Sequence, residues 1–145
     1  MAITQAVCSS FKQELLGGIH NFSASGGNTF KIALYTSSAT LDSSTTVYTT
    51  SNECPSTGNY TAGGNTLTTA TGSVFLSGTT AYIDFDDTTW ASSTISAAGA
   101  LIYNSSASNK AVLVLSFGGT YSSTNGNFTI QFPAATSSTA VLTLS

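Results

Sequence analysis

Beyond the glycine pair at 26–27, apolar residues recur at every second position and no helical period returns. In the segment 30–35, for example, Phe30, Ile32 and Leu34 take alternate positions. This spacing is typical of a β-strand with one buried face, because successive side chains of a strand point to opposite sides. A chain patterned in this way over most of its length has to form sheets, and it lacks the crossover helices of a parallel α/β fold.

Eight further segments are short, rich in β-branched or aromatic residues, and bounded by Gly, Asn and Ser, which indicates strands joined by turns. They are residues 45–50, 66–71, 73–76, 80–85, 100–103, 111–117, 128–132 and 140–144. Turn signals stand at Gly63–Gly64, Gly118–Gly119 and Asn125–Gly126. We therefore predict an all-β fold, an antiparallel β-sandwich of jelly-roll or immunoglobulin-like type, with residues 1–145 forming one domain.

The N-terminal segment 1–18 departs from this pattern. Its apolar residues Ile3, Val7, Phe11 and Leu15 follow one another in steps of four, and two glycines end the run. This spacing predicts one short helix between residues 4 and 16. Such a short helix needs a docking surface, either on its own sheet or on a neighbouring subunit. The second alternative makes Val7, Phe11 and Leu15 candidate interface residues.

The chain carries very little charge. Charged residues make up 6% of it, against about 25% in an average soluble domain, and Ser and Thr together supply about a third. A surface of this kind repels other copies weakly, so we expect self-association. With three lysines and no arginine, the chain lacks a cationic patch for phosphates, and we expect no nucleic-acid partner. We also expect no membrane partner, because no stretch resembles a signal peptide or a membrane span.

Residues suited to catalysis are few. His20 is the only histidine, and it follows a glycine pair where a turn or helix exit is expected. A Ser-His-Asp system would depend on this single base, and no GxSxG motif precedes a helical pattern. No spacing singles out a pair of carboxylates for glycoside hydrolysis. We therefore expect no enzymatic activity and no cofactor.

Asp84, Asp86 and Asp87 form the only charge cluster, in the sequence YIDFDD. Strand alternation places Asp84 and Asp86 on one face and Phe85 on the other, and oxygen ligands of this kind suit a hard cation such as Ca²⁺. The spacing does not match an EF-hand loop. A solvated strand end is therefore the preferred interpretation, with the three aspartates as weak metal candidates.

Two other groups of residues invite a structural and a functional interpretation. Cys8 and Cys54 have no CxxC spacing, which favours two free, buried thiols and synthesis in a reducing cytoplasm over a disulfide. The loops 36–44 and 51–65 could extend outward. Aromatic residues could form a sugar-binding platform, although such residues more often belong to a core or interface; they are Tyr35, Tyr48, Tyr60, Tyr82, Trp90, Tyr103 and Tyr121.

Several blocks together resemble a group of small β-rich structural proteins of tailed bacteriophages and prophages. These blocks are AVCSSFKQELLGGIHNF, TFKIALYTSSATLDSSTTVY, GNYTAGGNTL, TTWASSTISAAGALIYN and AVLVLSFGG, and they cover most of the chain. The resemblance implies a virion component made in the bacterial cytoplasm, either a capsid decoration protein or a part of the tail or fibre. The loop NECPSTGNY, with Cys54 and Pro55, departs from the group's pattern.

Our leading hypothesis is a capsid decoration or cement protein that binds itself and the major capsid protein or another virion protein. Strand edges and the apolar stripe of the helix would supply its contacts. One alternative is a tail or fibre component that binds host-surface glycans. Another is a protein that assembles into a filament or tube from this chain alone.

Overall fold

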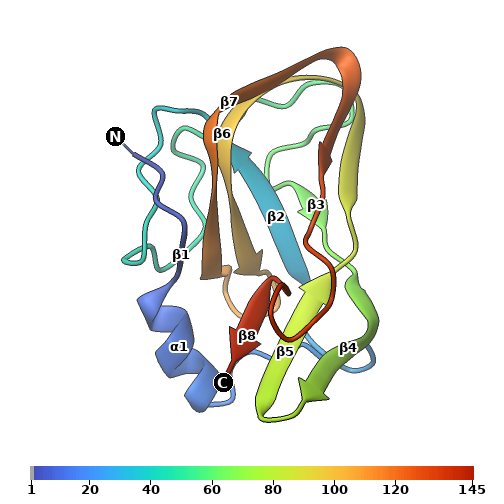
Figure 1. Cartoon of the computed structure of the whole chain (residues 1–145). Helices are drawn as coiled ribbons and strands as arrows, with labels where there is room; N and C mark the ends of the chain where they lie inside the picture. The colour runs from blue at the N-terminus through green and yellow to red at the C-terminus, as the bar shows by residue number, and fades with distance from the viewer. Residues whose placement is uncertain (1) are drawn as a thin grey trace.

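The computed structural model describes residues 2–145, apart from the side chains of residues 70–73, and confirms a mostly β, sandwich-like chain with one short helix (Figure 1). Its strands form two antiparallel sheets, one of order β1-β7-β6-β2-β3 and one of order β4-β5-β8. The elements are β1 (Ala6–Val7), α1 (Ser9–Leu16), β2 (Phe30–Tyr35), β3 (Asn65–Thr66), β4 (Thr69–Ser77), β5 (Thr80–Phe85), β6 (Thr88–Asn104), β7 (Lys110–Ile130) and β8 (Leu142–Leu144).

The long hairpin of β6 and β7 forms the centre of the larger sheet. Its register runs from Thr88 opposite Ile130 to Asn104 opposite Lys110, with several register shifts along the way. Such irregularities bend and twist a strand pair. Residues 118–119 and 125–126 lie inside β7, so the prediction that they form turns is wrong. At both places the backbone takes a left-handed conformation within the strand instead.

The other strand predictions vary in accuracy. The segments 30–35 and 80–85 are confirmed as β2 and β5, but β2 is buried on both faces rather than on one, since every residue of it except Lys31 is buried. The predicted strand 45–50 is wrong, because this segment forms only an isolated bridge from Val47 to Lys110. The segments 100–103, 111–117 and 128–132 overlap one long hairpin rather than three separate short strands.

An aromatic cluster joins the two sheets and the helix in one core. Phe22 stacks on Phe30 of β2 with ring centroids 4.3 Å apart, and Phe85 of β5 lies 6.1 Å from Phe30. Phe11 of α1 meets Phe22 edge-on at 6.0 Å. Aromatic pairs at these separations add to the stability that burial provides. The smaller sheet and α1 are therefore both attached to the larger sheet through these rings.

The two loops expected to extend outward fold back onto the sheets, so that prediction is wrong. In the loop 36–44, Leu41 is buried and pairs through its backbone with the N-terminal segment at Ile3. In the loop 51–65, Cys54 and Tyr60 are buried, and Cys54 donates its backbone N–H to the carbonyl of Leu34. Both loops bury apolar side chains that the local turn signals did not reveal.

Among the described residues, no helix is long and apolar enough to cross a membrane.

Candidate interaction surface

Helix α1 is confirmed, but it begins at Ser9 because the preceding residues pair with a strand. Ala6 and Val7 form β1 opposite Val114 and Leu113 of β7. The helix ends at the predicted glycine pair, where Gly18 has φ of 76° and the N–H of Ile19 bonds to the carbonyl of Glu14. Glycine adopts this left-handed conformation without a steric penalty. The chain then turns back towards β2.

The three predicted interface residues of this segment have different surroundings. Phe11 is only 1% exposed and packs in the chain's own core, so it docks α1 onto its own domain. Val7 and Leu15 are half-buried at the edge of that core and line a groove. Leu16, which the four-residue spacing did not include, is 90% exposed. The outer side of α1 therefore presents Leu15 and Leu16 rather than Phe11.

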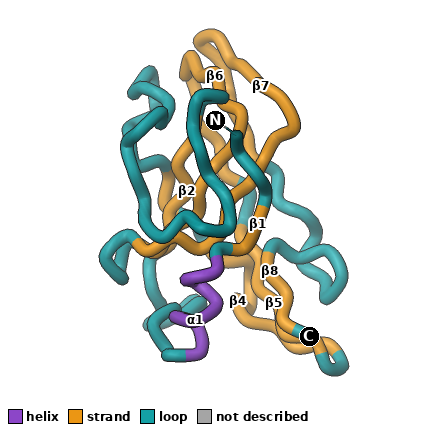
Figure 2. The backbone as a smooth tube through the Cα atoms, turned by 90° about the vertical axis from the view of Figure 1, so that its left-hand side faces the viewer, coloured by secondary structure: helices purple, strands orange, loops and turns teal. Residues whose placement is uncertain are grey.

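The groove has a volume of about 700 Å³ and lies between α1 and the smaller sheet. Figures 1 and 2 both show α1, β8, β5 and β4 gathered at the same end of the molecule. Helix α1 contributes Leu15 and Leu16 to one side of the groove, and β1 contributes Val7. The strands contribute the other side, with Val74, Ala81, Ile83, Leu142 and Leu144 among the lining residues.

The strand register explains why this side of the groove is apolar. One row runs from Val74 to Ile83 to Leu142, and the next from Leu76 to Ala81 to Leu144. Directly opposed residues of an antiparallel pair share one face of a sheet. All six residues therefore lie on a single face. Ile83 is buried, whereas the outer row ends in two exposed leucines.

Exposed apolar side chains are concentrated at this end of the molecule. Of the seven large apolar side chains that are exposed in the described part of the chain, five lie on α1, just after it, or on the smaller sheet. We call these five the apolar end: Leu16, Ile19, Val74, Leu76 and Leu144. Grouped exposed apolar side chains often mark an interaction site, whereas single exposed ones are common on any protein surface.

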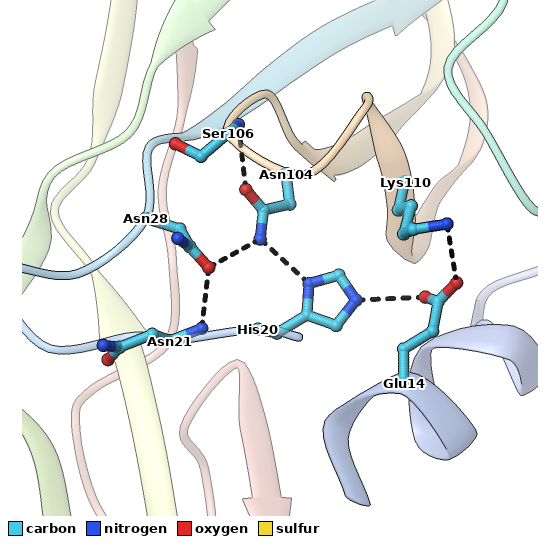
Figure 3. Close-up of polar contacts among 7 residues, drawn as sticks. All are labelled: Glu14, His20, Asn21, Asn28, Asn104, Ser106 and Lys110. Atoms are coloured by element: carbon cyan, nitrogen blue, oxygen red, sulfur yellow. Dashed lines mark hydrogen bonds and ion pairs between the residues drawn. The ribbon is translucent and has the colours of Figure 1, made fainter. Parts of the chain in front are cut away.

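A buried polar network holds the last turn and the exit of the helix in place (Figure 3). The Nε2 atom of His20 lies 3.0 Å from Oε1 of Glu14, and its Nδ1 atom lies 3.0 Å from Nδ2 of Asn104. Lys110 Nζ lies 3.6 Å from the other oxygen of Glu14. The network thus connects α1 to the ends of β6 and β7.

Two backbone donors determine the direction of this network. The N–H of Ser106 donates to Oδ1 of Asn104, and the N–H of Asn21 donates to Oδ1 of Asn28. The Asn104 nitrogen must therefore donate, to Asn28 and to Nδ1 of His20. His20 consequently carries its proton on Nε2 and donates it to Glu14. Because both ring nitrogens are engaged within the fold, His20 positions the helix exit.

The three candidate aspartates do not converge. β5 ends at Phe85, and Asp84 and Phe85 are both buried whereas Asp86 is exposed, so the predicted shared face of Asp84 and Asp86 is wrong. Asp84 accepts the N–H of Phe85 at 2.8 Å, and Asp87 accepts the N–H of Phe132 at 2.8 Å. Burial raises the pKa of the Asp84 carboxyl above its ordinary value. Among the described residues, no three His, Cys, Asp or Glu side chains are grouped to hold a metal ion.

Most of the aromatic residues proposed as a sugar platform belong to the core. Tyr35, Tyr60, Trp90 and Tyr103 are buried, so they cannot form such a platform. The tyrosines surround Glu53, whose carboxylate accepts hydrogen bonds from the hydroxyls of Tyr48 and Tyr60 and from the N–H of Gly63, at 2.6 to 2.8 Å. This cluster fixes the loop 51–65 to the sheet.

A second cleft, of about 920 Å³, lies between the distal half of β7 and the segment 131–141. None of the described side chains that line it is charged. Phe117 and the exposed Tyr121 meet edge-on there, with ring centroids 6.3 Å apart. The remaining aromatic and amide side chains of the lining are Phe128, Phe132, Gln5, Asn127 and Gln131.

Both cysteines are free and buried, as predicted. Burial, followed by the charges of Asp42 and Glu14, raises the pKa of the Cys8 thiol to about 11. Burial and the charge of Glu53 raise the pKa of the Cys54 thiol to about 11 as well. At neutral pH both are therefore protonated, and neither is an activated nucleophile.

Comparisons with protein-family models, curated proteins and solved structures found no significant match. The function is therefore inferred from the surface of the protein and from the sequence blocks quoted above.

Proposed function

We propose that this protein is a non-enzymatic structural subunit that binds other protein subunits through its apolar end. The observation that carries the proposal is the concentration of exposed leucine, isoleucine and valine side chains beside an apolar groove. From the sequence resemblance, we propose a tailed-phage virion as the assembly, with capsid decoration as the leading role. Copies of the chain and the major capsid protein are then its partners.

The size of the apolar end predicts how strongly one contact binds. The exposed fractions of its five side chains together equal about three fully exposed side chains. Burying them is worth roughly 5–10 kcal/mol, at about 1.5–3 kcal/mol each. Association itself costs an estimated 4–15 kcal/mol. A single contact is therefore weak, and binding to a repetitive lattice through many copies supplies the missing affinity.

The chemistry of the chain supports a role in binding rather than in catalysis. Its only histidine uses both ring nitrogens inside the fold. Both thiols are protonated at neutral pH because burial raises their pKa. The aspartates at the end of β5 bond to separate backbone N–H groups. These groups stabilise the fold, and the apolar end holds five of the seven exposed large apolar side chains of the described residues.

The test compares two valines that are similarly exposed. Val74 of the apolar end is 52% exposed, and Val47, far from it in sequence and outside the groove lining, is 47% exposed. Val74→Ser should weaken association by about 1 kcal/mol per contact, roughly fivefold, whereas Val47→Ser should leave it unchanged. Cosedimentation with capsids and with tails, followed by electron microscopy, measures occupancy and location. Equal binding by both variants would contradict the proposal.

A second candidate function is recognition of an uncharged glycan in the cleft beside β7. Its lining combines aromatic rings with amides and hydroxyls and has no charged side chain among the described residues. Sugar rings stack on aromatic faces while their hydroxyls bond to amides. Tyr121→Ala should then abolish binding to neutral glycans on an array, with Val47→Ala as the control. Absence of glycan binding by the unmodified protein would exclude this function.

A further inference from the structure

The edge of the smaller sheet at β8 has no bulge, no charge and no proline to prevent it from pairing with another chain. In the strand order β4-β5-β8, β8 has one neighbour and one free side among the described residues. Its residues Leu142, Thr143 and Leu144 include no charge and no proline, and its pairing with β5 has no register shift. The opposite edge, β4, does have a register shift, between Thr69 and Val74. Bulges, charges and proline are common protections of an edge strand, and of the remaining ones β8 has only its short length.

From this edge and the adjacent groove, we infer that a second copy of this chain binds at the apolar end, with β8 pairing antiparallel to β8 of the second copy. The inference rests on the proposed function, whose partner surface it specifies. The result is a continuous six-stranded sheet of order β4-β5-β8-β8-β5-β4 with two-fold symmetry. An antiparallel pairing of a strand with its own copy satisfies that symmetry automatically.

The register of such a pairing follows from the length of the strand. Centred on Thr143, it places Leu142 opposite the second copy's Leu144, and opposed residues share one face. The two apolar rows of the smaller sheet then continue across both copies, and the second copy's Leu144 enters the groove beside Leu15. A three-residue strand forms few main-chain hydrogen bonds. The strand therefore sets the register, and the apolar rows supply the contact area.

A second copy fits this surface better than a polar partner would. Lys12 is the only charged residue among those that line the groove, so two copies meet there with little electrostatic repulsion. In a two-fold contact each copy also buries the exposed leucines of the other. A partner with a polar surface would bury the leucines of only one copy of the chain, and its own polar groups would be left without hydrogen-bond partners.

The experiment introduces a cysteine at the centre of the proposed pairing. Thr143→Cys brings two thiols face to face across the dimer axis, at a Cβ separation close to that of a disulfide. Thr120→Cys, exposed on β7, is the matched control. The native thiols are buried and should not interfere. Treatment of the purified protein with diamide, without added capsids, should crosslink Thr143→Cys into a dimer on a non-reducing gel and leave Thr120→Cys monomeric.

A second variant tests the same pairing without crosslinking. Thr143→Lys places two like charges opposite each other and should raise the dimer dissociation constant about tenfold or more, measured by sedimentation equilibrium. If Val74→Ser weakens assembly but Thr143→Cys does not crosslink and Thr143→Lys assembles normally, the strand pairing is wrong and the proposed function stands. If, in addition, Val74→Ser and Val47→Ser bind capsids and tails equally well, both the strand pairing and the proposed function are wrong. A chain that stays monomeric alone at all concentrations overturns the second copy as the partner.

Discussion

Replacing two residues of α1 by alanine should affect two different properties, the stability of the fold at one position and assembly at the other. Phe11 is 1% exposed and packs against Phe22 and His20, whereas Leu16 is 90% exposed at the end of the helix. Phe11→Ala removes a fully buried ring and leaves a cavity, which costs about 3–5 kcal/mol of unfolding free energy. Leu16→Ala removes almost no buried surface and should change stability by less than about 0.5 kcal/mol. Leu16→Ala should instead weaken assembly.

Urea unfolding followed by Trp90 fluorescence measures the stability, and sedimentation velocity of the folded proteins measures the assembly. The loss for Phe11→Ala is a large part of a typical total of about 5–15 kcal/mol. Phe11→Leu, which keeps much of the volume, provides a milder variant that should still fold. If Phe11→Ala loses less than about 1 kcal/mol, or if Leu16→Ala loses as much as Phe11→Ala, α1 is not docked through Phe11 as described.

Three further changes test the interior of the fold. Asn104→Ala should lower the unfolding free energy by about 2–3 kcal/mol, because buried partners lose their hydrogen bonds, and the loss should not add to that of His20→Ala in a double-mutant cycle. Burial raises the pKa of Asp84, so the folded state binds that proton more tightly, and the unfolding free energy should fall as the pH rises from about 4 through the raised pKa. In urea unfolding between pH 4 and 7, the unfolding free energy of Asp84→Asn should depend less steeply on pH than that of the unmodified protein. An unchanged pH dependence would refute this. Gly64→Ala should lower the unfolding free energy by at least about 3 kcal/mol, because a Cβ there would meet the β2 backbone at 1.7 Å. Gly26 has a similar φ but open space around it, so Gly26→Ala should lower the unfolding free energy by only about 1 kcal/mol.

The candidate surface could be predicted only in part. The four-residue spacing identified α1 and selected Val7 and Leu15, which both line the groove, although Val7 lies in β1 and not in the helix. The same spacing included Phe11, because periodicity selects a helix face and cannot tell whether the chain's own core or a partner covers it. Leu76 and Leu144 had no distinguishing sequence signal. Their exposure depends on which strands pair and on which face of the sheet remains uncovered.

What the sequence determined by itself is local. Period-two alternation in 30–35 and the β-branched and aromatic composition of 80–85 were sufficient to locate β2 and β5, because both are local properties of a single strand. The glycine pair at 17–18 ended α1, because glycine readily adopts the left-handed conformation. The very low charge also follows from composition alone.

Tertiary structure decided everything that depends on contacts between distant segments. The glycines at 118–119 look like a turn locally, yet β7 pairs with β6 on both sides of them, at Ser116 and at Tyr121, so the strand continues past them. The loop 51–65 looks exposed, yet Glu53 and the tyrosines bind it to the sheet. Whether an apolar side chain is buried or remains available to a partner is a property of the assembled sheets, because burial results from the sum of contacts across the fold and not from the residue's immediate neighbours.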